Sequence, residues 1–338
     1  MLKQYPQKLI LPNVPRIGFD IHMCPFPGSL YACLKHIDDL CDYDFLMSVT
    51  GAAFRRLWNR DDGGNVDLSY FREPPFQRVF DALGYEWKSY PVDRESMLAG
   101  VCESLSRGIP AISFGILGPP EAGLVAGYDR GGEVLYGWSY FQDQNQNYYE
   151  KRDWFETMDK NAFHGLIVLG NRTAARKSIR EVIKPTLEWA LDLALTVRRP
   201  ERPDHISGLA AYDSWADALE IDADYPPLDA KTLEWRAMIY GDQSTMLWER
   251  HEAAVFLHKA AQDCPEAGEA LDTAADLFEK VSGTISAIWP WGYSSNNEAI
   301  PGLIDPKVRR ELAEAVRTAK TFEVQAVNEL EKANRLLK

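Results

Sequence analysis

The spacing of apolar residues divides this chain into two parts with different patterns. Up to about residue 170, stretches with helical spacing come first and short apolar runs follow. After Asn171 the helical spacing continues almost to the end of the chain. Helices followed by an antiparallel sheet are typical of an α+β fold, and the remainder predicts an all-helical domain. We therefore expect two domains, residues 1–172 and residues 173–338.

Four helices are predicted in the first part from the apolar spacing and from the residues that begin and end them. Gly84 and Gly108 follow the third and fourth helices, as expected where a glycine ends a helix. The predicted ranges are 28–41, 44–58, 75–83 and 94–106.

Beyond residue 108 the spacing of apolar residues changes from the helical pattern to short apolar runs typical of strands. The stretch Asp129-Arg130-Gly131-Gly132 separates two apolar runs, and such a turn predicts a β-hairpin. Because neighbouring strands in a hairpin run in opposite directions, the sheet is predicted to be antiparallel. The predicted strands are 109–114, 123–128, 133–138 and 165–169.

In the second part, breaks are expected at the prolines of 200–203, 226–227 and 290–301, and the last helix at about 306–337. Arg250 interrupts an apolar stripe on a helix expected near 245–263, and Asp213 lies on the apolar face of another near 208–220. A buried guanidinium needs a carboxylate or a ligand anion beside it. We predict a buried ion pair between Asp213 and Arg250, with an anion in the ligand cleft as the alternative partner of Arg250.

Charge and composition narrow the expected partners. A formal net charge of −13 argues against nucleic acid or an anionic membrane as the main partner. No apolar stretch reaches membrane-spanning length and no signal-peptide pattern is evident, so a cytoplasmic protein is expected. The five cysteines lack paired spacing, which favours reduced thiols. Without HExxH or CxxC motifs we expect no metal and no cofactor. A homo-oligomer is compatible with the sequence.

Three segments together resemble the papain-like cysteine peptidase superfamily. They are GSLYACLKHI (28–37), RGIPAISFG (107–115) and GLVAGYDRGGEVLYGWS (123–139). The similarity is to the branch with bacteriocin-leader peptidases and the N-terminal domain of the butirosin-biosynthesis acyltransferase. Two later segments, AAYDSWADAL (210–219) and ERHEAAVFLHKAA (249–261), look like the helical domain attached to such acyltransferase-like proteins. The resemblance implies a papain-like first domain, in which the helix 28–41 packs against the sheet.

The positions that carry peptidase chemistry in that superfamily hold other residues here. Depending on the alignment of GSLYACL, the nucleophile position holds Ser29 or Leu30. Glu121 lies where the resemblance implies the general-base histidine, and Trp138 and Ser139 lie where the orienting residue belongs. A thiol–imidazole mechanism needs a nucleophile and a base within hydrogen-bond reach. The standard peptidase chemistry is therefore expected to be absent.

Three residues remain candidates for catalysis. Cys24 lies just before a helix N-terminus, whose dipole lowers a thiol pKa, and His22 is two residues away. The alternative is a buried, inert cysteine. Ser29 could carry an acyl group, or its hydroxyl could cap the helix.

Two kinds of side chain are candidates for ligand binding. The carboxylate of Glu121 would bind a cationic or polar ligand or act as an acid or base, unless it belongs to a solvated turn. Trp138 and Tyr140 belong to an aromatic series along the hairpin, which could line a pocket or form the sheet core. Arg250 would join this set if it met a bound anion.

The leading hypothesis is a non-proteolytic papain-fold protein that binds a small molecule or a peptide-like ligand in the former active-site cleft. One alternative is an acyltransferase or amide hydrolase of natural-product metabolism, with Cys24 or Ser29 as the acyl carrier. A structural or interaction protein is the third class. The sequence leaves open whether any catalysis remains.

Overall fold

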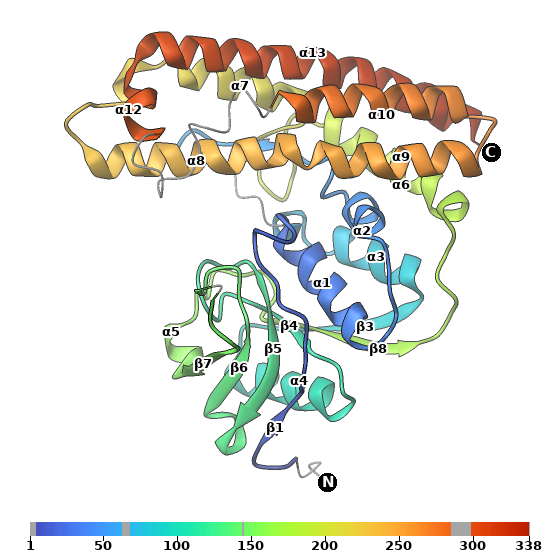
Figure 1. Ribbon diagram of the computed structural model, residues 1–338, viewed down its shortest axis with the longest axis vertical. Helices are drawn as coiled ribbons and strands as arrows, with labels where there is room; N and C mark the ends of the chain where they lie inside the picture. The colour runs from blue at the N-terminus through green and yellow to red at the C-terminus, as the bar shows by residue number, and fades with distance from the viewer. Residues whose placement is uncertain (1–4, 63–67, 144, 285–298, 338) are drawn as a thin grey trace. The chain divides into compact units, whose positions relative to one another are not determined.

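The computed structural model describes residues 5–62, 68–143, 145–284 and 299–337 (Figure 1). The chain forms two compact units, Met1–Leu46 with Asp67–Lys177, and Met47–Val66 with Ser178–Lys338. The division falls after Lys177, near the expected boundary at residue 172. In contrast to the expected contiguous domains, 47–66 belongs to the second unit. The reason is local packing, since Leu57 pairs with Ser207 and Phe54 contacts the ring of Phe278.

Prolines and glycines set the bounds of the helices of the first unit and of α2 (Tyr43–Thr50), which continues from Leu46 into the second unit. Helix α1 (Pro25–His36) starts three residues earlier than predicted, because prolines are tolerated in a first helical turn whose N–H groups have no helical partner. Helix α2 is shorter than predicted, because Gly51 adopts a left-handed φ of 86°. The ranges of α3 (Pro74–Leu83) and α4 (Arg94–Ser106) agree closely with the prediction. A single turn, α5 (Trp154–Thr157), follows the last hairpin.

An antiparallel sheet forms the centre of the first unit, as predicted. Its strand order is β3-β8-β4-β5-β6-β7, with β1 paired to β5. The hairpin predicted around 129–132 joins β5 and β6, and its register places Leu124 opposite Trp138. The strands are β1 (Leu9–Ile10), β3 (Tyr85–Tyr90), β4 (Ala111–Phe114), β5 (Ala122–Asp129), β6 (Val134–Trp138), β7 (Tyr149–Arg152) and β8 (Leu166–Arg172).

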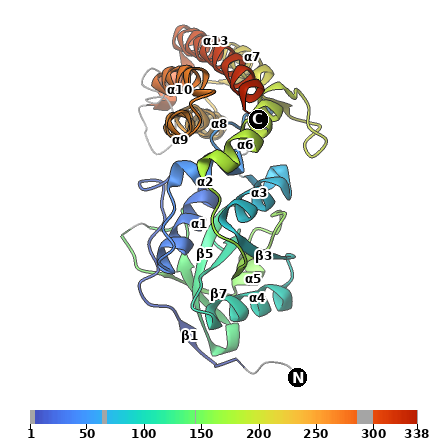
Figure 2. The same ribbon diagram turned by 90° about the vertical axis from the view of Figure 1, so that its right-hand side faces the viewer.

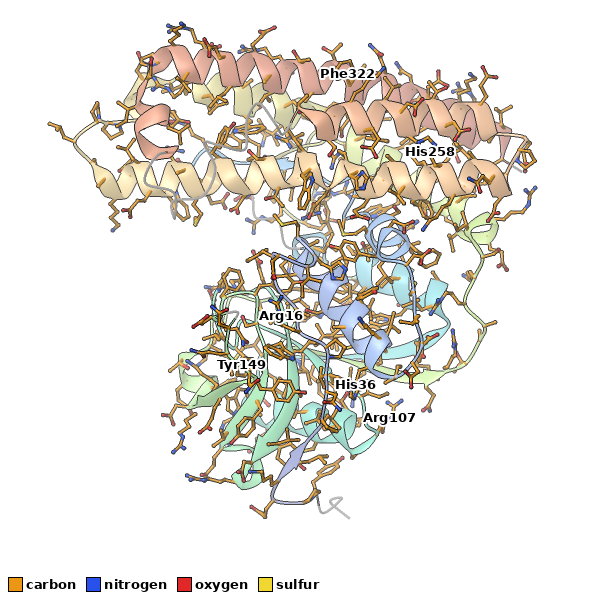
Figure 3. All side chains as sticks on the ribbon, in the orientation of Figure 1. Arg16, His36, Arg107, Tyr149, His258 and Phe322 are labelled. Atoms are coloured by element: carbon orange, nitrogen blue, oxygen red, sulfur yellow. The ribbon has the colours of Figure 1, made fainter. Side chains whose placement is uncertain are left out.

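Both faces of the central strand β5 are covered. Residues 122–128 are all buried, and consecutive strand residues point to opposite faces. Helix α1 packs against β4 and β5, as expected, and α4 packs against β4, β5 and β8 (Figure 2). From β7, the hydroxyl of Tyr149 donates to the carbonyl of Leu124 at 3.1 Å (Figure 3). This bond joins β7 to β5, one of the two strands against which α1 packs.

The second unit is a helical bundle. Its longest helix, α13, packs against α7 and α10, and α10 packs against α9. The predicted helix near 245–263 is two helices that meet at Glu249. Of the break predicted over 290–301, residues 290–298 lie outside the described residues. The helices are α6 (Ile179–Leu195), α7 (Leu209–Leu219), α8 (Ala230–Trp248), α9 (Arg250–Asp263), α10 (Gly268–Gly283), α12 (Ala299–Ile304) and α13 (Pro306–Leu336), with the strands β2 (Leu57–Trp58) and β9 (Ile206–Ser207).

Within the described residues, none of the helices combines the length and the apolar character needed to cross a membrane.

Candidate functional site

Cys24 occupies the residue position immediately before α1. Its backbone is extended, its carbonyl accepts a hydrogen bond from the Gly28 N–H at 3.0 Å, and its own N–H donates to the hydroxyl of Tyr43 at 3.2 Å. The residue is 1% exposed. From the sequence, Cys24 is expected a few residues before a helix that begins at residue 28, and the earlier start of α1 makes Cys24 its cap residue, where the helix dipole favours a thiolate. The thiol is nevertheless enclosed by protein.

Ser29 and Leu30, the two residues at the expected nucleophile position, lie inside α1 rather than at its start. Both are completely buried. The prediction that Ser29 caps the helix is wrong, because the prolines at 25 and 27 extend the helix past it and Cys24 takes the cap position. Within the described residues, the Ser29 hydroxyl has no hydrogen-bond partner. A substrate has no access to it in this arrangement.

His22 lies in a cluster of aromatic rings instead of facing an open cleft. Its ring stacks on Tyr43 with centroids 4.0 Å apart and meets the edge of Tyr31 at 4.7 Å. Burial, together with the charge of Lys35, lowers the His22 pKa to about 4, so the ring is neutral at pH 7. His22, Tyr31 and Tyr43 are each partly exposed, and we call them the aromatic cluster.

Tyr31 and Tyr43 were missed by the sequence analysis. Tyr31 lies one turn beyond Gly28 on α1, and Tyr43 is the first residue of α2. No local spacing links them to His22, because the contact depends on how α1, α2 and the preceding loop pack. The ring side chains His22, Phe26 and Tyr31, spaced over ten residues, were the local signal.

Gly28 brings Tyr140 against the start of α1. A Cβ at position 28 would lie 2.0 Å from the Tyr140 hydroxyl and 3.1 Å from the Cβ of His22. Tyr140 is 4% exposed and packs on Phe19 with ring centroids 4.9 Å apart. The structure thus brings together His22, Gly28 and Tyr140, although Tyr140 is packed against the helix instead of lining open space.

Glu121 and Trp138 belong to the same end of the sheet. Glu121 directly precedes β5, and Trp138, the last residue of β6, pairs with Leu124 near the start of β5. Glu121 is partly buried. Trp138 is 8% exposed, and its indole N–H donates to the carbonyl of Val14 at 3.0 Å. Trp138 therefore stabilises the packing of the N-terminal segment, and Glu121 is a partly buried carboxylate at the start of β5.

The predicted ion pair between Asp213 and Arg250 is wrong. Arg250 is fully buried as expected, but its Nη2 contacts Oε1 of Glu323 on α13 at 2.7 Å. The side chain of Asp213 is 53% exposed and pairs with Lys320. Apolar spacing placed Arg250 on an inner face correctly, but it could not identify which neighbouring helix supplies the carboxylate.

Arg250 also has no donor left for a bound anion. Its Nη1 donates to the carbonyls of Ala53, Arg55 and Met246 at 3.0–3.1 Å, and its Nη2 donates to that of Phe54 at 3.2 Å. With Glu323 bound at Nε and Nη2, the guanidinium is satisfied by protein atoms. Its role is to hold residues 53–55 against the helices of the second unit.

One group in the described residues has the side chains of a metal site. His205 is fully buried, with Nε2 at 2.9 Å from Asp62 and Nδ1 at 3.1 Å from Asp204. The sequence analysis missed this group because Asp62 is remote in sequence from the other two. Arg202 places its Nη2 at 3.3 Å from both Asp62 and His205, so a guanidinium already offsets the carboxylates. We interpret the group as an ion-pair network.

Comparison with known proteins adds no assignment: the sequence matches no protein-family model, and no curated protein is significantly similar to it.

Proposed function

We propose that this chain is a papain-fold protein without proteolytic activity, whose first unit binds a small molecule or a peptide-like ligand beside the start of α1. The state of His22 carries this proposal. A general base works best with a pKa near the operating pH, whereas burial holds the His22 pKa at about 4. Its ring is stacked on Tyr43, and partly exposed aromatic faces of this kind are typical of binding surfaces.

The arrangement around α1 supports the papain-like part of the proposal. Strands β4 to β8 follow the helices α1 to α4 in the chain, whereas β1 and β3 of the same sheet come earlier, and α1 packs against β4 and β5. Its first turns lie against Tyr140, just beyond the end of β6. The packing of α1 against the sheet is the relationship that the resemblance of GSLYACL and GLVAGYD to the superfamily implies. With Ser29 and Leu30 buried and Glu121 in place of a histidine, a binding role fits this end of the sheet better than peptide cleavage does.

One observation favours the alternative of an acyltransferase or amide hydrolase. Cys24 is the cap residue of α1, the position in which a helix dipole activates a thiol. Its 1% exposure argues against that role, since an acyl carrier must contact its substrate. A structural or interaction role remains the third class.

A combined binding and turnover experiment separates these functions. The full chain is incubated with a pool of short peptides and small acyl thioesters, and both retained ligands and products are identified by mass spectrometry. We expect retention of at least one unmodified compound, lost in Tyr43→Ala because a stacking face is removed. Tyr136→Ala, at a partly exposed tyrosine on β6, is the matched control and should retain the compound.

Two results would contradict the proposal. Turnover that Cys24→Ala abolishes would identify Cys24 as a nucleophile and favour the acyltransferase or hydrolase. Absence of both retention and turnover across the pool would favour the structural or interaction class.

A further inference from the structure

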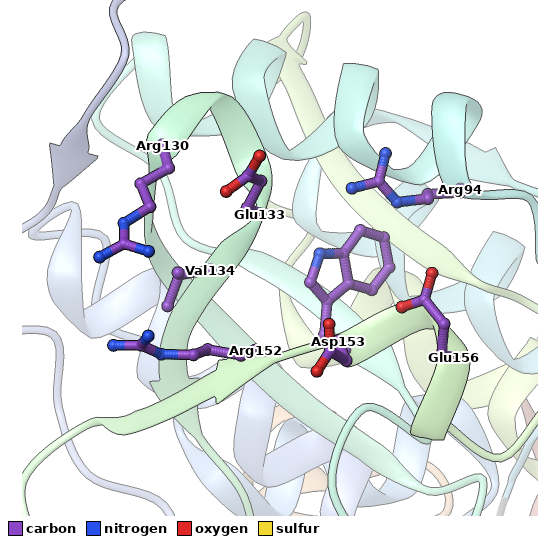
Figure 4. A pocket seen from close by; sticks show the side chains of 8 residues that line it. Arg94, Arg130, Glu133, Val134, Arg152, Asp153 and Glu156 are labelled. Carbon is purple, nitrogen blue, oxygen red and sulfur yellow. The ribbon is translucent and has the colours of Figure 1, made fainter.

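A pocket of about 350 Å³ is formed by the β5–β6 turn, the end of β7 and the start of α4 (Figure 4). None of its lining residues belongs to the aromatic cluster or its surroundings. The volume lies at the small end of the range for ligand pockets. The lining residues are Arg94, Arg130, Glu133, Val134, Arg152, Asp153, Trp154 and Glu156.

The floor of the pocket is apolar and fixed. Trp154 is 1% exposed, and its indole N–H donates to the carbonyl of Gly132 at 2.9 Å. Val134, the first residue of β6, is 3% exposed. Trp154 and Val134 therefore close the pocket from below, and little of either side chain is open to a ligand.

The rim carries three guanidinium groups and three carboxylates. Arg152 pairs with Glu150 outside the pocket, with Nη2 and Oε1 2.9 Å apart. The guanidinium of Arg94 lies 6.0 Å from the ring centroid of Trp154. In Figure 4, Arg94 extends from the start of α4, Glu133 from the β5–β6 turn and Glu156 from α5. Within the described part of the chain, Arg94 forms no ion pair with either carboxylate, so charges of both signs face the pocket without neutralising each other directly.

Two rim residues hold strained backbone conformations. Arg130 has a φ of 52° and Asp153 has a φ of 47°, in the left-handed region that residues other than glycine rarely adopt. Such conformations persist only where the surrounding structure enforces them, and they cluster at ligand sites. Here the Asp129 carboxylate accepts from the Arg130 N–H at 2.6 Å, and Gly131 donates to the Gln7 carbonyl at 2.9 Å. The turn that carries Arg130 and Glu133 is therefore preorganised.

We infer that this pocket binds a zwitterion, an α-amino acid or a short peptide, at a site separate from that of the proposed function. The ligand carboxylate would meet Arg94, because a guanidinium binds a carboxylate through two parallel hydrogen bonds. Its ammonium group would meet the carboxylate of Glu156, which lines the pocket with Arg94. A simple anion fits less well, because the three rim carboxylates would repel it.

Calorimetric titration of the full chain with matched probes tests this inference. The probes are L-leucine, L-leucinamide, which lacks the carboxylate, N-acetyl-L-leucine, which lacks the ammonium group, and inorganic phosphate. We expect leucine to bind, and each blocked analogue to bind about tenfold more weakly or worse, because one charge-assisted contact is lost. Phosphate should not bind.

Variants assign the binding to the pocket. Arg94→Gln and Glu156→Gln should each weaken leucine binding by about tenfold. Arg180→Gln is the matched control, since Arg180 is an exposed arginine that pairs with Glu266 and does not line the pocket. Tyr43→Ala should leave leucine binding unchanged, which keeps this result independent of the proposed function. Any of four results would overturn the inference. These are no binding of leucine, binding of leucinamide as tight as that of leucine, phosphate as the only probe that binds, and leucine binding that is unchanged in both Arg94→Gln and Glu156→Gln.

Discussion

Arg250 and Glu323 form a buried ion pair with two contacts, Nη2 to Oε1 at 2.7 Å and Nε to Oε2 at 3.0 Å. They are 73 residues apart in the chain and join α9 to α13. Glu323 also accepts a hydrogen bond from the hydroxyl of Tyr212 on α7. The pair therefore connects three helices and, through the carbonyls that Arg250 binds, residues 53–55 of the same unit.

Removing the carboxylate of this pair should strongly destabilise the second unit. Glu323→Ala leaves the Arg250 guanidinium buried without its counter-charge, which costs about 3–5 kcal/mol of unfolding free energy. Asp213→Ala is the control and should cost at most about 1 kcal/mol, because its pair with Lys320 is largely exposed. Urea denaturation of both variants measures the difference. Equal losses would show that the buried pair has no special role.

Arg56 should respond differently from Arg250, although both are fully buried. Its guanidinium lies 4.2 Å from the Tyr212 ring centroid and 4.7 Å from that of Trp215, and burial lowers its pKa to about 10. No carboxylate in the described residues pairs with it directly. Replacement of such a cation by an apolar side chain leaves no orphaned charge.

We therefore expect Arg56→Met to change the free energy of unfolding by no more than about 1 kcal/mol, or to raise it. Arg250→Met should cost about 3–5 kcal/mol, since Glu323 would then lack its partner. Denaturant unfolding of the two variants provides the comparison. A larger loss for Arg56→Met would mean that its contacts with the rings outweigh the cost of burying the charge.

A side chain at position 28 should destabilise the first unit, because it would collide with the hydroxyl of Tyr140. In Gly28→Ala the new Cβ would lie 2.0 Å from that oxygen, so overpacking should cost about 1–3 kcal/mol despite the better helix propensity of alanine. In a Tyr140→Phe background most of this cost should disappear. A double-mutant cycle by urea denaturation measures the coupling between the two positions, with Gly283→Ala as a control where a Cβ meets no atom of the described residues within 4 Å. Additive effects would place Tyr140 away from α1.

His164 should make the first unit less stable in mild acid. Its ring is 1% exposed, packs on Phe76 and lies within 2.6 Å of the Ser89 hydroxyl through Nδ1. Burial, reinforced by the charge of Arg72, lowers its pKa from 6.5 to about 4. At pH values between 4 and 6.5, His164 binds a proton more readily in the unfolded chain than in the folded one. The free energy of unfolding therefore has its full value above pH 6.5 and falls as the pH drops towards 4.

The slope due to His164 should approach about 1.4 kcal/mol per pH unit. His164→Leu removes the titrating group, and the stability of this variant should fall less steeply over the same pH range. Urea denaturation of the wild type and the variant at several pH values measures both slopes. Parallel curves would show that His164 is protonated equally in the folded and unfolded states.

Part of the candidate site was predictable and part was not. The apolar spacing of residues 28–41 placed Cys24 shortly before a helix, and the two strand patterns around Asp129 fixed which residues lie at the end of the hairpin. The burial of Ser29, the stacking of His22 on Tyr43 and the fit of Gly28 to Tyr140 depend on contacts between segments distant in sequence. None of these follows from local spacing.

The sequence by itself determined the local elements: α4 and the β5–β6 hairpin follow from apolar period and turn residues, which act over a few neighbouring positions. It also determined that Arg250 faces inward. Tertiary structure alone decided that Glu323, and not Asp213, is its partner, and that Met47–Val66 belongs to the helical unit. The physical reason is that periodicity shows which face of an element is buried, whereas the partner of that face is selected by the packing of the whole unit.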